Sequence, residues 1–147
     1  GKTHLAAAIA NYQRRLGQPV IFVVVPDLLD LLRSTYSSEN TSAFELLEKL
    51  KREPLLILDD FGTEASTPWS QEKLYQLINY RYNARLPTII TSYFNLDQIE
   101  SRFSSRMGDS RLSTVIAITA PDYRIDRPRQ AEQPQRPARK QWRKQTY

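Results

Sequence analysis

Residues 55–58 are four consecutive apolar residues that run directly into two carboxylates, Asp59 and Asp60. An apolar run without alternation predicts a strand buried on both faces, which is typical of a parallel sheet covered by helices. Similar runs occur at 19–25, 87–92 and 113–119, and the segments between them have helical spacing. The sequence therefore predicts an α/β fold, a mainly parallel sheet with helices on both faces.

The helical segments are recognised by their apolar spacing and by their ends. Thr67 followed by Pro68 is a good helix start, with Thr as the N-cap and Pro at the first helical position. Further helices are predicted near 28–32, 44–50 and 96–103, and residues 34–42 predict a polar loop. The first helix is predicted over residues 3–16, with one apolar face formed by Leu5, Ala8, Ile9, Tyr12 and Leu16.

The composition bounds the class of protein. A chain of 147 residues fits one domain with a real core, and its apolar runs are too short to span a membrane. The chain has no Cys, which excludes disulfides and thiolate metal sites. We therefore expect a protein that is compatible with a reducing cytoplasm.

The positive charge is concentrated at the end of the chain. The net charge is +5, and residues 121–147 hold eight of the 21 basic side chains but three of the 16 acidic ones. With four Pro and five Gln in that segment, we expect a disordered basic tail over 126–147, after a domain over 1–125. The tail predicts weak, salt-sensitive contact with nucleic acid, helped by Trp142; a solvated linker is the alternative.

The chain opens with Gly1-Lys2-Thr3, the last three positions of the phosphate-binding loop G-x-x-x-x-G-K-[ST]. In that motif Lys2 would reach the β and γ phosphates of a nucleotide, and the Thr3 hydroxyl would bind Mg²⁺. Backbone amides at the start of the following helix would add partial positive charge. A single tripeptide also occurs by chance, so its meaning depends on the acids downstream.

Asp59 and Asp60 supply the second half of a nucleotide site. We expect Asp59 to hold Mg²⁺, and Asp60 to orient or deprotonate the attacking water. A polar turn after a strand is the alternative for such a pair. The nucleotide hypothesis requires Lys2 and Asp59 to face one triphosphate, and a placement on opposite sides of the sheet would refute it.

Further polar residues follow the third predicted strand. Ser92 and Tyr93 stand at its end, where nucleotide-sensing polar groups often lie beside the γ phosphate; a strand that simply runs into a loop is the alternative. Arg102 and Arg106 are four residues apart and so share one helix face. A guanidinium offered to a neighbouring subunit would stabilise transition-state charge, whereas a solvated helix face is the alternative.

Several short motifs occur in a fixed order along the chain. They are Gly1-Lys2-Thr3-His4-Leu5-Ala6, Leu56-Ile57-Leu58-Asp59-Asp60-Phe61-Gly62-Thr63-Glu64, Trp69, Leu77-Ile78-Asn79-Tyr80-Arg81-Tyr82, Leu86-Pro87-Thr88-Ile89-Ile90-Thr91-Ser92, Ser105-Arg106-Met107 and Ala120-Pro121-Asp122-Tyr123-Arg124. Together they resemble the DnaC/IstB family of AAA+ ATPases, which comprises bacterial helicase loaders and transposition helper ATPases. The resemblance covers roughly residues 1–125 and implies a three-layer P-loop sheet.

The resemblance also implies a function. It implies an ATP- and Mg²⁺-dependent ATPase of DNA replication that assembles with copies of itself and acts with single-stranded DNA and a replicative helicase. It implies that Gly1, Lys2 and Thr3 are Walker A residues, that Asp59 and Asp60 are Walker B residues, and that Arg106 is the arginine finger in trans. The alternatives are an IstB-like helper of a transposase, or a remnant that binds DNA or a helicase without hydrolysis. A P-loop kinase is disfavoured because the motif series fits the ATPases.

Two departures from the family pattern carry expectations of their own. Tyr93 stands where the family usually has the sensor Asn, and a phenol cannot copy an amide, so we expect slower hydrolysis. The strand that precedes the loop is central in such sheets, between the third and fourth strands predicted here. Without it we expect either a gap of roughly 9–10 Å or a rearranged sheet, and weak ATP binding.

Overall fold

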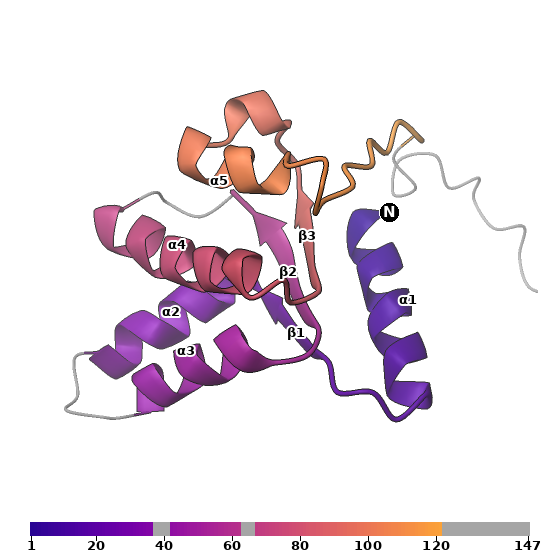
Figure 1. Ribbon diagram of the computed structural model, residues 1–147. Helices are drawn as coiled ribbons and strands as arrows, with labels where there is room; N and C mark the ends of the chain where they lie inside the picture. Colours follow the sequence, from indigo (N-terminus) through magenta and orange to yellow (C-terminus); the bar gives the residue numbers. More distant parts are fainter. Residues whose placement is uncertain (37–41, 63–66, 122–147) are drawn as a thin grey trace, which may run out of the picture.

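The computed structural model describes residues 1–36, 42–62 and 67–121, without the side chains of Thr35, Tyr36 and Ser42. The elements are α1 (Lys2–Arg15), β1 (Ile21–Val24), α2 (Val25–Tyr36), α3 (Ser42–Arg52), β2 (Leu56–Phe61), α4 (Pro68–Asn83), β3 (Thr88–Ser92), the 3-10 helix η1 (Leu96–Gln98) and α5 (Ser101–Met107) (Figure 1). Three predicted features lie outside the described residues: most of the loop 34–42, the motif residues Thr63, Glu64 and Arg124, and the tail over 126–147 with Trp142.

The described strands form one parallel sheet in the order β1-β2-β3. Helix α1 covers one face of the sheet, and α2, α3 and α4 lie on the other (Figure 1). Alternate residues of β2 serve the two faces, because Ile57 packs with α1 whereas Leu56 and Leu58 pack in the larger core. The predicted α/β fold with helices on both faces is therefore confirmed.

The start of α4 follows from its first residues. Thr67 is the N-cap, its hydroxyl accepts from the amide of Ser70, and Pro68 occupies the first turn. The Ser70 hydroxyl in turn accepts from the amide of Thr67, which completes a capping box. This local chemistry fixes where α4 begins, as the sequence predicts.

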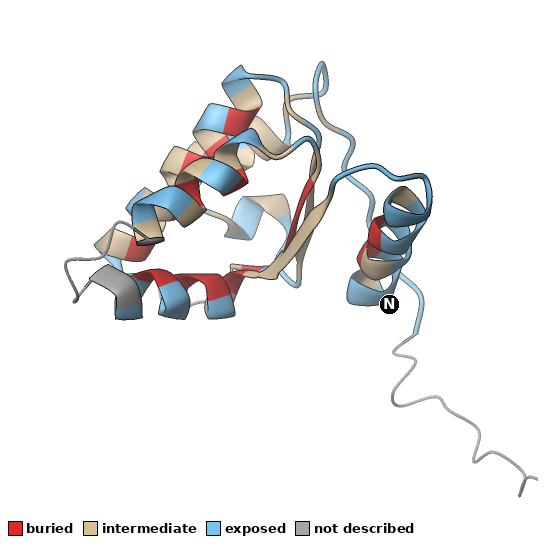
Figure 2. Cartoon of the chain, turned by 90° about the horizontal axis from the view of Figure 1, so that it is seen from below, coloured by how far each residue is buried: buried red, intermediate tan, exposed pale blue. Residues whose placement is uncertain are grey.

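The prediction of which face of α1 packs against the sheet is wrong. The side of the helix that touches the sheet is formed by Ala6 and Ala10, which are 2% and 8% exposed. The predicted apolar face lies on the outside of α1, where Figure 2 shows mostly exposed positions. All of its residues are exposed: Leu5, Ala8, Ile9, Tyr12 and Leu16. Alanine lets the helix backbone approach the sheet closely, and the periodic pattern marks a face that nothing in the described chain covers.

The predicted fourth strand is also absent. Residues 113–119 lie within the described ranges but form no strand, and Val115 and Ile116 are 60% and 78% exposed. A strand needs a hydrogen-bonding partner, and β3 is the edge of the sheet on that side of the described structure. Residues 113–119 therefore have a strand-forming composition but join no sheet in the described ranges.

The predicted helix over 96–103 is divided in two. The chain forms η1, becomes extended at Ile99 and Glu100, and starts α5 at Ser101. Phe103 of α5 is buried and packs edge-on against Phe61, with ring centroids 5.4 Å apart. No helix in the described ranges has the length and hydrophobicity of a membrane span.

Candidate nucleotide site

The two acids form a bulge near the carboxyl end of β2. Leu58 pairs with Ile90 and Phe61 pairs with Ser92, so two residues of β2 stand opposite one residue of β3. Those two residues are Asp59 and Asp60. Bulges re-aim side chains locally, and here Asp59 is buried, at 4% exposed, while Asp60 is exposed with a left-handed φ of 64°.

Thr91, the residue opposite the bulge, binds both acids through one hydroxyl. It donates to Oδ1 of Asp59 over 2.6 Å and accepts from the amide of Asp60 over 3.1 Å. No role was predicted for Thr91 from the sequence. A signal was present, because a hydroxyl residue next to the end of a strand parallel to β2 reaches the same edge as the acids.

Ser92, the last residue of β3, joins the ends of β2 and β3 through its hydroxyl. Its hydroxyl donates to the carbonyl of Phe61 over 2.8 Å and accepts from the amide of Phe94 over 3.0 Å. Gly62 has a φ of 91°, and a Cβ there would lie 3.0 Å from the ring of Phe94. Ser92 therefore holds the backbone where β2 and β3 end, and its single hydroxyl proton is donated to the carbonyl of Phe61.

Lys2 lies at the same edge of the sheet. Its Nζ is 5.9 Å from the centroid of the Tyr93 ring, and Tyr93 directly follows β3. Figure 1 shows the N-terminus of α1 at the end of the sheet to which the β2 arrow points. Asp59 is bonded to Thr91 of β3, so Lys2 and the acid pair stand at one end of neighbouring strands and not on opposite sides of the sheet.

The start of α1 offers donors that suit phosphate. Gly1 is the N-cap, and no side chain caps the helix. The first intrahelical bond runs from the amide of Leu5 to the carbonyl of Gly1, so the amides of Lys2, Thr3 and His4 have no acceptor within the helix. Such amides, with the helix dipole behind them, are suited to an anion.

The acid pair supplies part of the donor set that a divalent cation such as Mg²⁺ uses, and a nucleotide would supply more of it. Among the described residues there is no group of three or more His, Cys, Asp or Glu side chains that could hold a metal ion. Mg²⁺ is usually held by one or two carboxylates together with substrate phosphates, and it keeps several waters. Asp59 and Asp60 provide that kind of donor set, and the Thr3 hydroxyl is exposed at the start of α1.

Arg106, the predicted arginine finger, lies against α4 and not against the acids of its own chain. Its Nε donates to Oδ1 of Asn79 over 3.0 Å, and its Nη2 donates to the hydroxyl of Tyr75 over 2.9 Å. Nη1 of Arg106 donates to the backbone carbonyl of Arg102 over 2.6 Å. Arg102 itself pairs with Glu100 and is 3.8 Å from Glu72. The structure does not bring either arginine to the acid pair of the same chain.

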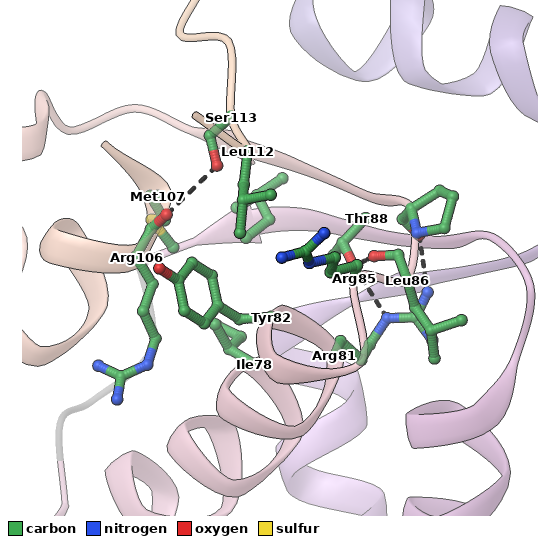
Figure 3. A pocket seen from close by; sticks show the side chains of 12 residues that line it. Ile78, Arg81, Tyr82, Arg85, Leu86, Thr88, Arg106, Met107, Leu112 and Ser113 are labelled. Carbon is green, nitrogen blue, oxygen red and sulfur yellow. Dashed lines mark hydrogen bonds between the residues drawn. The ribbon is translucent and has the colours of Figure 1, made fainter. Parts of the chain in front are cut away.

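A cavity of about 310 Å³ lies away from this site. Pro87 and Thr88, at the start of β3, line it, whereas the acids are next to the end of β3. Arg106 also lines the cavity, but in Figure 3 its guanidinium points away from the other lining residues, whereas the Arg85 side chain lies among them. The cavity and the acids are at opposite ends of β3, so the cavity is not part of the candidate site.

The chain is similar to known ATP-binding and helicase-loader proteins. Residues 1–118 match the family described as IstB-like ATP binding protein. The replicative helicase loader DnaI of Bacillus subtilis (strain 168) is 30% identical over 134 residues, which are 86% of this chain and 42% of DnaI. The replicative helicase loader DnaC of Escherichia coli (strain K12) is 28% identical over 109 residues, which are 74% of this chain and 44% of DnaC.

A solved structure supports the same relationship. The crystal structure of DnaI superimposes with a TM-score of 0.59 at 36% identity, covering 67% of this chain and 51% of that one. The chain spans less than half the length of the curated relatives it matches. Because the family match covers most of the chain and the fold is that of P-loop AAA+ proteins, the chain belongs to the IstB-like ATP-binding family, which includes the DnaC-type helicase loaders.

Proposed function

We propose that this chain is the ATPase part of a DnaC-type helicase loader, and that it binds and hydrolyses ATP while a replicative helicase is placed on single-stranded DNA. The observation that supports the proposal is that Lys2 and the acid pair lie at the same end of the sheet: Lys2 contacts Tyr93, which directly follows β3, and Asp59 is bonded to Thr91 near the end of β3. The loader names of DnaC and DnaI support the choice of partner.

Each residue has a distinct part in the proposed reaction. The Lys2 ammonium and the amides at the start of α1 balance phosphate charge, and Gly1 lets the backbone approach the phosphates. Thr3 and Asp59 hold the cation, and Asp60 orients or deprotonates the attacking water. Mg²⁺ bound with ATP supplies further charge neutralisation on the β and γ phosphates.

Arg106 completes the proposed site from a neighbouring subunit. It is only partly buried, and its hydrogen bonds to Tyr75 and Asn79 orient it on the α4 side of the molecule. A homo-oligomer that presents this side to the acid pair of the next copy would put a guanidinium near the transferred phosphate. Such an arginine typically raises kcat by about 10³- to 10⁵-fold.

The Lys2→Ala variant tests the nucleotide role. We expect it to abolish ATP turnover, measured as phosphate release, in the 147-residue chain and in the same chain extended by a complete phosphate-binding loop and its preceding strand. The control is Lys49→Ala, which removes an exposed ammonium from α3 and should leave turnover unchanged. Equal turnover in the Lys2→Ala protein and the original protein would refute the assignment.

Mixing of variants tests the action of Arg106 in trans. Lys2→Ala chains and Arg106→Ala chains should each be inactive, and an equal mixture should recover part of the activity because one type of interface then has both groups. Arg102→Ala serves as the matched control, and it should retain turnover. No recovery in the mixture would contradict a finger supplied by a neighbour.

A second candidate function is binding without hydrolysis. The contact between the Lys2 ammonium and the Tyr93 ring favours this function, because the ring competes with a phosphate for that ammonium. In that case the chain would bind DNA or a helicase with the same affinity whether ATP is present or not. Sedimentation with the replicative helicase and with single-stranded DNA, each with and without ATP, separates the two functions. An IstB-like transposition helper would bind a transposase in place of the helicase in the same assay.

A further inference from the structure

We propose that Thr91 is the positioning residue of the acid pair, and that its hydroxyl sets how Asp59 takes up a divalent cation. The inference rests on the proposed nucleotide function, because it concerns the same site. It adds a residue that contacts both acids in the described structure. The hydroxyl of this residue donates a hydrogen bond to Asp59 and accepts one from the amide of Asp60.

The hydrogen bonds fix the direction of the hydroxyl. A threonine hydroxyl has one proton, and here that proton is donated to Oδ1 of Asp59 over 2.6 Å. The short separation is typical of an O–H group that donates to a carboxylate. In the described part of the chain Oδ2 of Asp59 accepts no hydrogen bond. Thr91 therefore occupies one carboxylate oxygen and leaves the other to a cation or to its water shell.

The same oxygen also supports an unusual backbone. Asp60 has a φ of 64°, a left-handed conformation that is uncommon for residues other than glycine. Its amide donates to Thr91 Oγ1 over 3.1 Å, at the place where the bulge interrupts the β2–β3 ladder. Because the hydroxyl gives its proton to Asp59, its lone pairs remain for the Asp60 amide. One side chain thus couples the orientation of the first acid to the backbone of the second.

The other hydroxyl groups of β3 have different partners. Thr88, at the opposite end of the strand, accepts from Nε of Arg81 and donates to the carbonyl of Leu86. Ser92 donates to the carbonyl of Phe61. Thr91 is the β3 hydroxyl that touches an acid in the described residues, so Thr88 offers a matched control on the same strand.

The experiment compares Thr91→Val, Thr91→Ser and Thr88→Val with the original 147-residue chain. Calorimetry gives the Kd for ATP in EDTA and in excess Mg²⁺, and the ratio of the two values measures how strongly the site couples nucleotide to cation. We expect Thr91→Val to reduce this ratio by about 10- to 100-fold, the usual effect of removing a group that orients a metal ligand. Thr91→Ser keeps the hydroxyl and should retain the ratio, and Thr88→Val should retain it even if the protein becomes less stable.

A second readout uses Mn²⁺ alone. In NMR spectra, low concentrations of Mn²⁺ should broaden the amide signals of Asp59 and Asp60, and Thr91→Val should need about tenfold more Mn²⁺ for equal broadening. A Thr91→Val protein that is less stable but equal to the original in both readouts would overturn the inference, because the hydroxyl would then only hold the bulge. If the original chain binds no ATP in either buffer, the proposed function fails, and the Mn²⁺ titration still decides whether Thr91 positions the acids.

Discussion

Nη1 of Arg81 lies 2.8 Å from the carbonyl oxygen of Leu50, and this bond joins α4 to the end of α3. The same nitrogen also donates to the carbonyls of Lys51 and Glu53. The carbonyls of a last helical turn lack donors within their own helix, and a positive charge there is favourable to the helix dipole. Burial lowers the pKa of Arg81 to about 10, so the side chain remains charged at neutral pH.

Arg81 also holds the start of β3. Its Nη2 donates to the carbonyl of Pro87 over 2.7 Å, and its Nε donates to the hydroxyl of Thr88 over 2.9 Å. The guanidinium is 1% exposed and thus links α3, α4 and β3 from inside the protein. The bonds require the planar fork of arginine, which lysine cannot reproduce.

We therefore predict that Arg81→Lys lowers the free energy of unfolding by about 3 kcal/mol, because buried carbonyls lose their donors. Urea denaturation followed by circular dichroism measures the change. The matched control is Arg85→Lys, one turn further along the chain, where the arginine is exposed. A loss no larger than that of the control would show that the bonds of Arg81 contribute little to stability.

Asp109 predicts a specific dependence of stability on pH. Hydrogen bonds, chiefly from the Arg111 side chain and next from the Tyr82 hydroxyl, hold the pKa of Asp109 well below its ordinary value of 3.8. As pH falls, the unfolded chain takes up this proton before the folded one does. The contribution of Asp109 to stability is therefore complete above about pH 4 and is lost as the pH falls below it.

The Asp109→Asn variant should remove this acid dependence. We expect its free energy of unfolding to fall less than that of the original chain between about pH 5 and about pH 2.5. Urea titrations at several pH values in this range measure both slopes. Tyr82→Phe removes one of the two residues that donate to Asp109 and should give an intermediate slope. Parallel curves for the original chain and Asp109→Asn would contradict the role given to Asp109.

The orientation of α1 leads to opposite expectations for adjacent residues. Ala6 is 2% exposed and touches the sheet, so Ala6→Leu should lower the free energy of unfolding by about 1–3 kcal/mol through overpacking. Leu5 is 58% exposed, so Leu5→Gln should change it by less than about 0.5 kcal/mol. Chemical denaturation of the two variants measures both values. The reverse order of the two effects would mean that α1 packs through its larger residues.

Tyr93 is expected to weaken nucleotide binding through its contact with Lys2. The ring is 79% exposed, and a cation–π contact at an exposed position is worth about 0.5–1 kcal/mol. Tyr93→Leu removes this competition, so we expect ATP to bind about two- to fivefold more tightly. Tyr93→Phe keeps the ring and should leave the Kd unchanged. Calorimetric titration measures both, and equal values for Leu and Phe would exclude the ring contact as the cause.

Local sequence rules predict the elements that depend on few residues. Thr67 and Pro68 specify the start of α4 through a cap and a fixed φ, which need no distant partner. The apolar run before Asp59 predicts β2, because a strand buried on two faces tolerates few polar positions. The end of the sheet at which Asp59 and Asp60 lie also follows from the sequence, since the carboxyl ends of parallel strands lie at the same end of a sheet. The position of Lys2 beside it was a requirement of the nucleotide hypothesis.

Other features depend on contacts between distant segments. Periodicity identifies an apolar face on α1 but cannot tell whether a neighbour covers it, and close packing on the sheet selects Ala6 and Ala10. Residues 113–119 have the composition of a strand, yet a strand exists only where a partner supplies hydrogen bonds. The bulge at Asp59 and its bond to Thr91 require the register between β2 and β3, which no local pattern encodes.

Apolar patterning and short motifs are thus enough to predict the parallel α/β arrangement and to nominate candidate residues for phosphate and a cation. Which hydroxyl binds Asp59 and which arginine is buried depends on the folded chain, because each of these contacts joins groups about 30 residues apart that meet only on folding.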